Sequence, residues 1–180
     1  MAVEIQLTHG KVALVDDVFA DQVSGYRWYL DVAGSNRFYA RRNYYRVNGK
    51  HFQERMHRLI MSLYLGRDLA SSEEIDHINN NGLDNRVENL RIVTRRQNNA
   101  NQRPQTRTKS SQYKGVCLLK NRRWQAQIKV NGKPIWLGSF RDEKNAARAY
   151  NRAALRHFGE FACLNDIAEA REAVVHAIRE

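Results

Sequence analysis

Short runs of apolar and aromatic residues follow one another along the first 50 positions of the chain. They read EIQL, KVALV, YRWYL, RFYARR and YYRV, and the segments THG, AGSN and NGK provide turns between them. This pattern predicts a β-rich N-terminal segment made of short strands. The stretch DDVFADQVSG interrupts it and predicts one short helix that ends at Gly25.

The spacing of apolar residues changes over residues 54–65. There they recur at intervals of three and four, which predicts an amphipathic helix that Gly66 ends. These apolar residues are Met56, Leu59, Ile60, Leu63 and Tyr64. His57 lies within this helix. We expect His57 to pack in the core, and an accessory role near an active site is the alternative.

The next region is rich in asparagine. The segments EEID and LRIVT predict strands, and the polar segment NNNGLDNRVEN between them predicts an ordered loop held by side-chain bonds to the backbone. Thr94 and Gln97 have the spacing of a capping box, which predicts a helix from about Arg95. Asn98 falls at or just past its first turn. The predicted order is strand, loop, strand, helix.

The last third of the chain predicts a second compact unit. Residues 101–112 contain no apolar side chain and predict a linker. RWQAQIKV and PIWLGSF predict two strands joined by the hairpin NGK, followed by an alanine-rich helix that ends at Gly159 and a final helix, DIAEAREAVVHAIR. Alternation predicts that Trp124, Ala126, Ile128, Val130, Ile135 and Leu137 face the helix. Gln125, Gln127, Lys129 and Trp136 are then expected to face outward.

The charge of the chain indicates its partner. The formal net charge is +11 and the sequence pI is near 10.0, which favours nucleic acid first and an acidic membrane surface second. From Asn89 to Arg141 there are thirteen Lys or Arg residues and no Asp or Glu, so this half is expected to contact phosphate. The N-terminus lacks the features of a signal peptide, and no segment approaches the roughly 20 apolar residues of a membrane span, so no membrane partner is expected.

The two cysteines indicate the redox setting of the protein. Cys117 and Cys163 lie far apart and are expected to be reduced thiols of an intracellular protein.

The predicted strand, loop, strand and helix can bring Asp76, His77 and Asn98 together. Carboxylate and amide oxygens suit Mg²⁺, and histidine can take a proton from water near neutral pH.

These three residue types suit metal-assisted hydrolysis of a phosphodiester. An asparagine behind the histidine, such as Asn89, could fix its ring. Side chains at 76 and 77 point to opposite faces of an ideal strand. They can therefore serve one site only if the strand bends or ends there.

The stretch from His57 to about Gln102, HRLIM and then IDHINNNGLDNRVENLRIVTRRQNNANQ, resembles the HNH endonuclease family in its branch of phage and intron-encoded homing endonucleases. The resemblance implies a β-β-α-metal fold in which His77 is the general base and Asn89 orients it. It also implies that Asp76 and Asn98 bind one divalent ion, Mg²⁺ or Mn²⁺. Asn98 stands where many members have histidine, and an amide is a weaker ligand than imidazole.

The same resemblance implies a substrate and a setting. The expected substrate is double-stranded DNA, cut as a nick or a double-strand break, with the protein acting as a monomer on DNA. The expected location is the cytoplasm of the bacterial host of a phage.

Residues 113–165, with YKGV, WLGSF, AARAYNRAA and FGEFACLN, resemble the Apetala2/ethylene-response-factor DNA-binding family. The resemblance implies a three-stranded antiparallel sheet that lies in the major groove and one helix on its back. Cys117, Gln127 and Lys129 depart from the plant pattern, so a base preference is not carried over. Expected DNA contacts are Lys114, Lys120, Arg122, Arg123, Gln125, Gln127, Lys129 and Trp136, together with Arg103, Arg107 and Lys109 of the linker.

The sequence thus predicts an α+β protein. A β-rich segment would lead into a β-β-α-metal nuclease module at 1–100, a basic linker would span 101–112, and residues 113–180 would form the DNA-binding domain with a C-terminal helix. The predicted function is a metal-dependent homing-type DNA endonuclease. A DNA-binding regulator with an inactive nuclease module is the main alternative, and an RNA-binding protein is a third.

Overall fold

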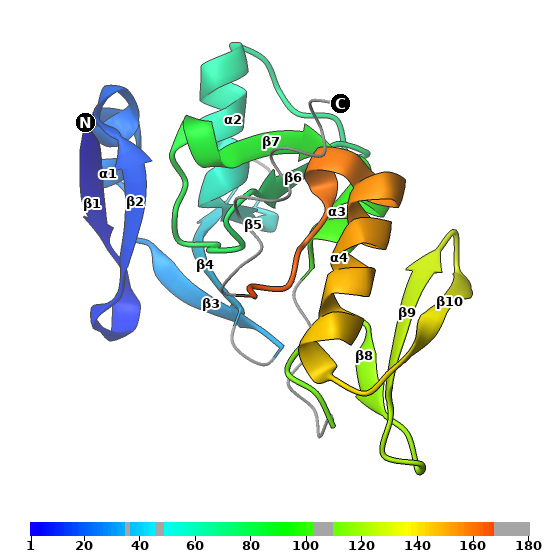
Figure 1. Ribbon diagram of the computed structural model, residues 1–180. Helices are drawn as coiled ribbons and strands as arrows, with labels where there is room; N and C mark the ends of the chain where they lie inside the picture. Colours follow the sequence, from blue (N-terminus) through cyan, green and yellow to red (C-terminus); the bar gives the residue numbers. More distant parts are fainter. Residues whose placement is uncertain (35–36, 46–48, 103–109, 168–180) are drawn as a thin grey trace. The chain divides into compact units, whose positions relative to one another are not determined.

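A computed structural model describes residues 1–34, 37–45, 49–102 and 110–167. The chain divides into two compact units, Met1–Asn99 and Ala100–Glu180. The described ranges contain four α-helices and four small antiparallel sheets, so the protein has mixed α and β structure (Figure 1).

The N-terminal unit contains sheets of two, three and two strands, in the orders β1-β2, β3-β4-β5 and β6-β7. The strands are β1 (Ala2–Gln6), β2 (Val12–Asp16), β3 (Tyr29–Ala33), β4 (Arg37–Tyr45), β5 (His51–Arg55), β6 (Glu74–His77) and β7 (Leu90–Val93). The α-helices are α1 (Ala20–Ser24), α2 (Met56–Leu65) and α3 (Arg95–Asn101). The last two residues of α3 belong to the second unit. Short 3-10 helices occupy Thr8–Gly10, Asp17–Phe19 and Val87–Asn89.

Two boundaries differ from the sequence prediction. RFYARR and the start of YYRV form one continuous strand, β4, instead of two. The helix predicted from residue 54 begins at Met56, because His51–Arg55 pairs with β4 as β5, from Arg41 opposite Arg55 to Tyr45 opposite His51. This pairing is a tertiary contact, which outweighs the local helical pattern.

Local signals at the helix ends agree with the structure. Gly66 ends α2 in the left-handed conformation, with φ 63°. Gln97 N donates to Thr94 Oγ1 at 3.3 Å, and Thr94 N donates back to Gln97 Oε1 at 2.8 Å, which is the predicted capping box at the start of α3.

The core of the N-terminal unit forms around Trp28 and helix α2. Trp28 is 2% exposed, and its indole N–H donates to the carbonyl of Val23 at 2.9 Å. Met56 and Ile60, on one face of α2, are fully buried. Helix α2 contacts β4, β5 and β6, so it lies between the three-stranded sheet and the strand that carries His77.

The C-terminal unit is a three-stranded sheet with helix α4 packed on it (Figure 1). Its elements are β8 (Val116–Leu118), β9 (Trp124–Val130), β10 (Lys133–Phe140), α4 (Glu143–Phe158) and a 3-10 helix at Gly159–Phe161. Ala146, Ala147 and Ala154 are fully buried, so small side chains bring α4 close to the sheet. Tyr150 lies over Gly115, where an added Cβ would meet its ring at 2.1 Å.

Burial along β9 follows the predicted alternation, whereas on β10 Ile135, which was expected to face the helix, is 37% exposed. Ala126 and Ile128 are buried, whereas Gln127 and Lys129 are exposed. Trp136 is 67% exposed, next to an irregularity of register between Trp136 and Gly138. The structure does not describe residues 103–109 and 168–180. Most of the predicted linker and most of the final helix predicted at 166–179 therefore lie outside the described residues.

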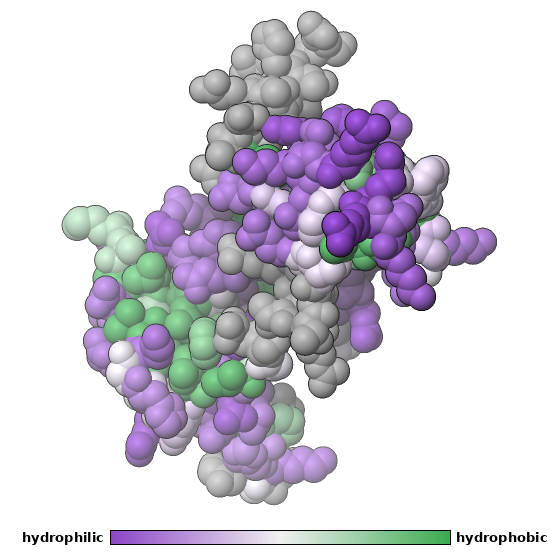
Figure 2. Space-filling model, turned by 60° about the horizontal axis from the view of Figure 1, so that its bottom comes forward, coloured by the Kyte–Doolittle hydropathy of each residue, from purple (hydrophilic) through white to green (hydrophobic). Residues whose placement is uncertain are grey.

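On the face of the molecule seen in Figure 2, hydrophilic residues predominate and a smaller hydrophobic area stands among them. No helix that the structure describes has the length and hydrophobicity needed to cross a membrane. Within the described ranges, Cys117 and Cys163 are not joined by a disulfide.

Candidate active site

The asparagine-rich loop between β6 and β7 is held by its own side chains. Asn79 Oδ1 accepts from Asn81 N at 2.8 Å, and Asn81 Oδ1 accepts from Leu83 N at 3.2 Å. Asn79 Nδ2 donates to Asp84 Oδ2 at 2.9 Å, and the Arg86 guanidinium on the same carboxylate lowers the pKa of Asp84. Side-chain bonds therefore replace regular secondary structure here, as the composition predicted.

The N-terminal hairpin supports this loop from outside. Leu14 of β2 donates its N–H to Leu83 O and accepts from Asn85 N, both at 2.8 Å. Asp16 Oδ2, at the end of β2, accepts from Val87 N at 2.8 Å. The chain thus uses its first strands to position residues more than 60 places further along.

His77 is the last residue of β6 and is 5% exposed. Its Nε2 lies 3.3 Å from Oδ1 of Asn85, which is fully buried. Asn85 Nδ2 donates to Leu83 O, so the amide oxygen is directed at the imidazole. Burial lowers the pKa of His77, and the charge of Arg55 also lowers it, although Asn85, Asp76 and Asp84 act in the opposite direction. His77 is therefore a neutral base at neutral pH.

The asparagine beside His77 is not the one that the sequence suggested. Asn89 is buried, but its Oδ1 accepts from Asn79 N at 3.0 Å and its Nδ2 donates to Asp84 O at 2.7 Å. These contacts make Asn89 a support of the loop. Asn85 was not singled out from the sequence, because no local signal separates it from the other asparagines.

Asp76 lies on the opposite face of β6 from His77, because neighbouring residues of a strand point to opposite sides. Asp76 is 7% exposed, and its Oδ2 accepts from Nη2 of Arg91 at 2.9 Å and from its Nε at 3.1 Å. Arg91 is the residue directly opposite Asp76 on β7. β6 ends at His77, and the charge of Asp76 is close enough to His77 to act on its pKa.

Asn98 lies on the Asp76 side of β6. Its Nδ2 donates to Glu74 Oε2 at 2.7 Å, and Glu74 and Asp76 are two residues apart on one face of β6. This bond fixes the orientation of the Asn98 amide, with its nitrogen toward Glu74. The structure thus brings Asp76 and Asn98 to the same face.

The donor set fits a hard divalent cation. Asp76 would supply a carboxylate and Asn98 an amide oxygen, and Mg²⁺ commonly uses one or two protein oxygens with water and phosphate in its other positions. Within the described ranges, no group of three or more His, Cys, Asp or Glu side chains is placed to hold a metal. Any ion at this site would share the Asp76 carboxylate with Arg91.

His57 is buried on α2, as expected, and its ring lies beside that of His77. It is 6% exposed, and its ring lies 5.0 Å from the ring of His77, edge to face. The ring of Tyr39 on β4 lies 5.8 Å from His57 and 5.9 Å from His77. Sheet β3-β4-β5 therefore reaches the candidate base.

The expected DNA contacts of the C-terminal unit fall into two groups. Lys120, Arg122, Gln127, Lys129 and Trp136 are exposed, and Gln125 is half-buried beside Gln127. Arg123 instead binds across the sheet to Ser139, through Nε to Oγ at 2.9 Å and through Nη2 to the carbonyl at 2.7 Å. Arg103, Arg107 and Lys109 lie outside the described residues.

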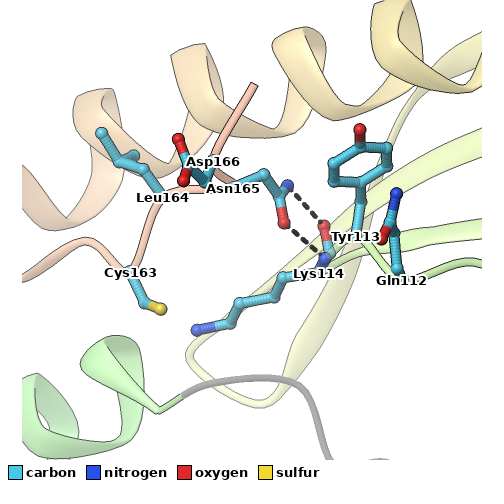
Figure 3. A pocket seen from close by; sticks show the side chains of 7 residues that line it. All are labelled: Gln112, Tyr113, Lys114, Cys163, Leu164, Asn165 and Asp166. Carbon is cyan, nitrogen blue, oxygen red and sulfur yellow. Dashed lines mark hydrogen bonds between the residues drawn. The ribbon is translucent and has the colours of Figure 1, made fainter. Parts of the chain in front are cut away.

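Lys114 likewise has a structural role. Its Nζ donates to the carbonyls of Ala100 at 2.7 Å and Gln102 at 2.6 Å. Figure 3 shows its backbone joined to the Asn165 side chain, which accepts from Lys114 N at 2.6 Å and donates to Lys114 O at 3.1 Å. The Asn165 backbone in turn exchanges two bonds with buried Asn151, at 2.8 and 2.9 Å. The pocket of about 350 Å³ shown in Figure 3 is thus lined by Lys114 and Asn165, whose hydrogen bonds join two segments of this unit.

Comparison with known proteins finds a likeness over the region that includes α2, β6, the loop and β7. The HNH endonuclease family model matches residues 54–100. An HNH endonuclease of Acanthamoeba polyphaga mimivirus is 33% identical over 145 residues, which cover 81% of this chain and 70% of that protein. The chain therefore belongs to the HNH endonuclease family.

A second likeness covers a shorter stretch. An AP2/ERF and B3 domain-containing protein of Oryza sativa subsp. japonica is 54% identical over 56 residues, 31% of this chain and 15% of that protein. An AP2/ERF and B3 domain-containing transcription factor of Arabidopsis thaliana is 51% identical over 47 residues, 26% of this chain and 14% of that protein. The viral relative comes from a mimivirus and not from a bacteriophage, so it gives the expected bacterial host no support.

Proposed function

We propose that this protein is a metal-dependent DNA endonuclease of the homing type, which hydrolyses a phosphodiester bond of double-stranded DNA as a nick or a double-strand break. Membership of the HNH family supports nuclease activity on DNA. The observation that carries the proposal is the position of His77, a buried neutral base at the end of β6 beside Asp76. The proposed setting is a monomer acting on DNA.

His77 is the proposed general base. A proton on Nε2 donates to Asn85 Oδ1, and this tautomer makes Nδ1 the basic atom. In the reaction, Nδ1 takes a proton from the attacking water. Buried neighbours hold the ring in place, so little reorganisation is needed before the proton moves. The role predicted for Asn89, orienting His77, is assigned to Asn85 in this proposal.

Asp76 and Asn98 are the proposed ligands of one divalent ion, Mg²⁺ or Mn²⁺. Such an ion supplies charge stabilisation at the scissile phosphate and the leaving oxygen. Arg91 holds the Asp76 carboxylate in position, and Glu74 fixes the orientation of the Asn98 amide. These two contacts keep both oxygen donors on the same face of β6.

Residues 113–180 are the proposed separate DNA-binding module, and the basic linker at 101–112 is proposed to contact DNA between the two modules. The exposed side of β9 and β10 presents Gln127, Lys129 and Trp136 away from α4. Ammonium groups suit phosphate, and an exposed aromatic ring suits contact with sugar or base. Lys120 and Arg122, in the turn before β9, extend the basic surface.

One assay tests the proposed function. Supercoiled plasmid is incubated with the protein and Mg²⁺, with His77→Ala as the matched variant, and the ends are mapped. Cleavage should fall by about 10² to 10⁴ in the variant while DNA binding is unchanged. Cleavage by the variant at the wild-type rate would contradict the assignment of His77. Binding without cleavage by the wild type would favour the regulator alternative.

A further inference from the structure

Two arginines meet on one face of the sheet β3-β4-β5. Arg41 on β4 and Arg55 on β5 are directly opposite in the antiparallel register, so their side chains emerge on the same side. Like charges in this position repel and weaken the sheet. One acid on this face offsets them: Asp31 of β3, whose Oδ2 lies 3.3 Å from Nη2 of Arg55.

Arg41 has no partner of its own. Across the described part of the chain, its guanidinium makes no hydrogen bond or ion pair, and its Nε is buried without an acceptor. A buried donor without an acceptor costs free energy, and such a group in a folded protein calls for an explanation. The planar fork of a guanidinium matches the oxygens of a phosphate. An anion bound at this face would relieve the repulsion between Arg41 and Arg55.

The pair of arginines lies next to the candidate base. The Arg55 guanidinium stacks 4.5 Å above the ring of Tyr39, which is two residues from Arg41 on the same face of β4. Tyr39 contacts His77 with its ring centroid 5.9 Å away. The positive charge of Arg55 is close enough to help lower the pKa of His77. Arg55, Tyr39 and His77 therefore form a continuous path on one side of the sheet.

We propose that Arg41 and Arg55 form a phosphate-binding site for the backbone of duplex DNA, beside the phosphodiester bond on which His77 acts. The proposal rests on the proposed function, because it places the substrate strand on the sheet that borders His77. The side chain of Arg55 is 43% exposed, so the backbone of a duplex can reach its guanidinium. This site lies outside the basic region of residues 89–141.

The test measures DNA binding without cleavage. In the His77→Ala background, the affinity for a duplex oligonucleotide is measured by fluorescence anisotropy over a range of salt concentrations. Arg41→Gln and Arg55→Gln should each lower the slope of log affinity against log salt by about one, and the double variant by about two. Arg67→Gln is the matched control, because Arg67 follows the far end of α2 and is already paired with Glu73 at 2.7 Å.

Two further measurements keep the outcome clear. Arg41→Lys and Arg55→Lys retain the charge but lose the planar fork, so each should keep the wild-type slope and bind the duplex more weakly than the control does. Arg41→Gln should unfold at the wild-type temperature or above it, since repulsion is relieved. If a Gln variant does not fold, the Lys variants decide: a Lys variant whose affinity equals that of the control would overturn the phosphate site. Slopes of the folded Gln variants equal to that of Arg67→Gln would also overturn it.

The cleavage assay separates this site from the proposed function. If the wild type cleaves DNA and the slopes do not change, the phosphate site is wrong and the nuclease function stands. If the slopes fall but the wild type does not cleave DNA, the phosphate site stands and the nuclease function is wrong.

Discussion

The imidazole rings of His57 and His77 lie edge to face with their centroids 5.0 Å apart, and Nδ1 of His57 is buried without a hydrogen-bond partner in the described part of the chain. Burial, followed by the charges of His77, Arg55 and Arg58, lowers the pKa of His57 well below its ordinary value. Burial also lowers the pKa of His77. Both rings are therefore neutral in the folded protein at neutral pH, and protonation of either places a cation in a buried site.

This relationship predicts acid-sensitive stability. For a histidine whose folded pKa is lowered, the stabilisation is fully present above the unfolded pKa of about 6.5 and is lost as pH falls toward the folded value. Each pKa unit of difference corresponds to about 1.4 kcal/mol. The free energy of unfolding in urea should thus fall from pH 7.5 to pH 5. His57→Phe should reduce this fall, whereas the exposed control His157→Gln should not. Equal pH dependence in all three proteins would refute the argument.

The rate of cleavage should depend on the same lowered pKa. A general base must be neutral, so kcat/KM should fall on acidification through the pKa of His77 in the free enzyme. Because burial lowers that pKa, the midpoint of the acid limb should lie below pH 6.5. A profile of plasmid nicking against pH measures it. A midpoint at or above 6.5 would show that His77 is not the base, or that DNA-free His77 is not buried.

Asn85 and Asn89 should have separable effects. Asn85→Ala removes the acceptor beside His77 and should lower the cleavage rate by up to about 10²-fold, within the effect of losing a base. Asn89→Ala removes the bonds to Asn79 N and Asp84 O and should lower the free energy of unfolding by about 1–3 kcal/mol. Single-turnover rates and urea unfolding are measured for both. A larger loss of rate at constant stability in Asn89→Ala would return the orienting role to Asn89.

Metal dependence should follow Asp76. Asp76→Asn keeps an acceptor for Arg91 but removes the negative charge, so the Mg²⁺ concentration for half-maximal rate should rise by at least about tenfold. Asp68→Asn removes the same charge from an exposed position and is the control. An unchanged half-saturation point in Asp76→Asn would place the ion elsewhere.

The close contact of the loop with β4 predicts intolerance to a methyl group at Gly82. A Cβ there would lie 2.3 Å from the carbonyl oxygen of Phe38 and 2.6 Å from the ring of Tyr39. Gly82→Ala should therefore lower the free energy of unfolding by roughly 1–3 kcal/mol and also lower the rate, because Tyr39 contacts His77. Gly25→Ala is the matched control, since nothing lies within 4 Å of its added Cβ. Equal stability of the two variants would mean that the loop can shift without cost.

Features with local causes were predictable from the sequence. The order strand, loop, strand and helix around His77, the end of α2 at Gly66 and the capping box of Thr94 and Gln97 each depend on residues within a few positions of one another. The alternation along β9 was predictable because it reflects which side of a sheet is buried. The boundary at β5 was missed, since the partner strand decides it.

By itself, the sequence determined the residue types of the site and the local structure that carries them, because capping, periodicity and turn preferences act between near neighbours in the chain. Only the tertiary structure decided that Asn85 rather than Asn89 lies against His77, since chemically identical side chains differ here only in how the loop packs on β2. It also decided that Lys114 binds carbonyls and that Arg41 lies opposite Arg55. Register and packing join residues far apart in the chain, and no pattern of nearby residues encodes them.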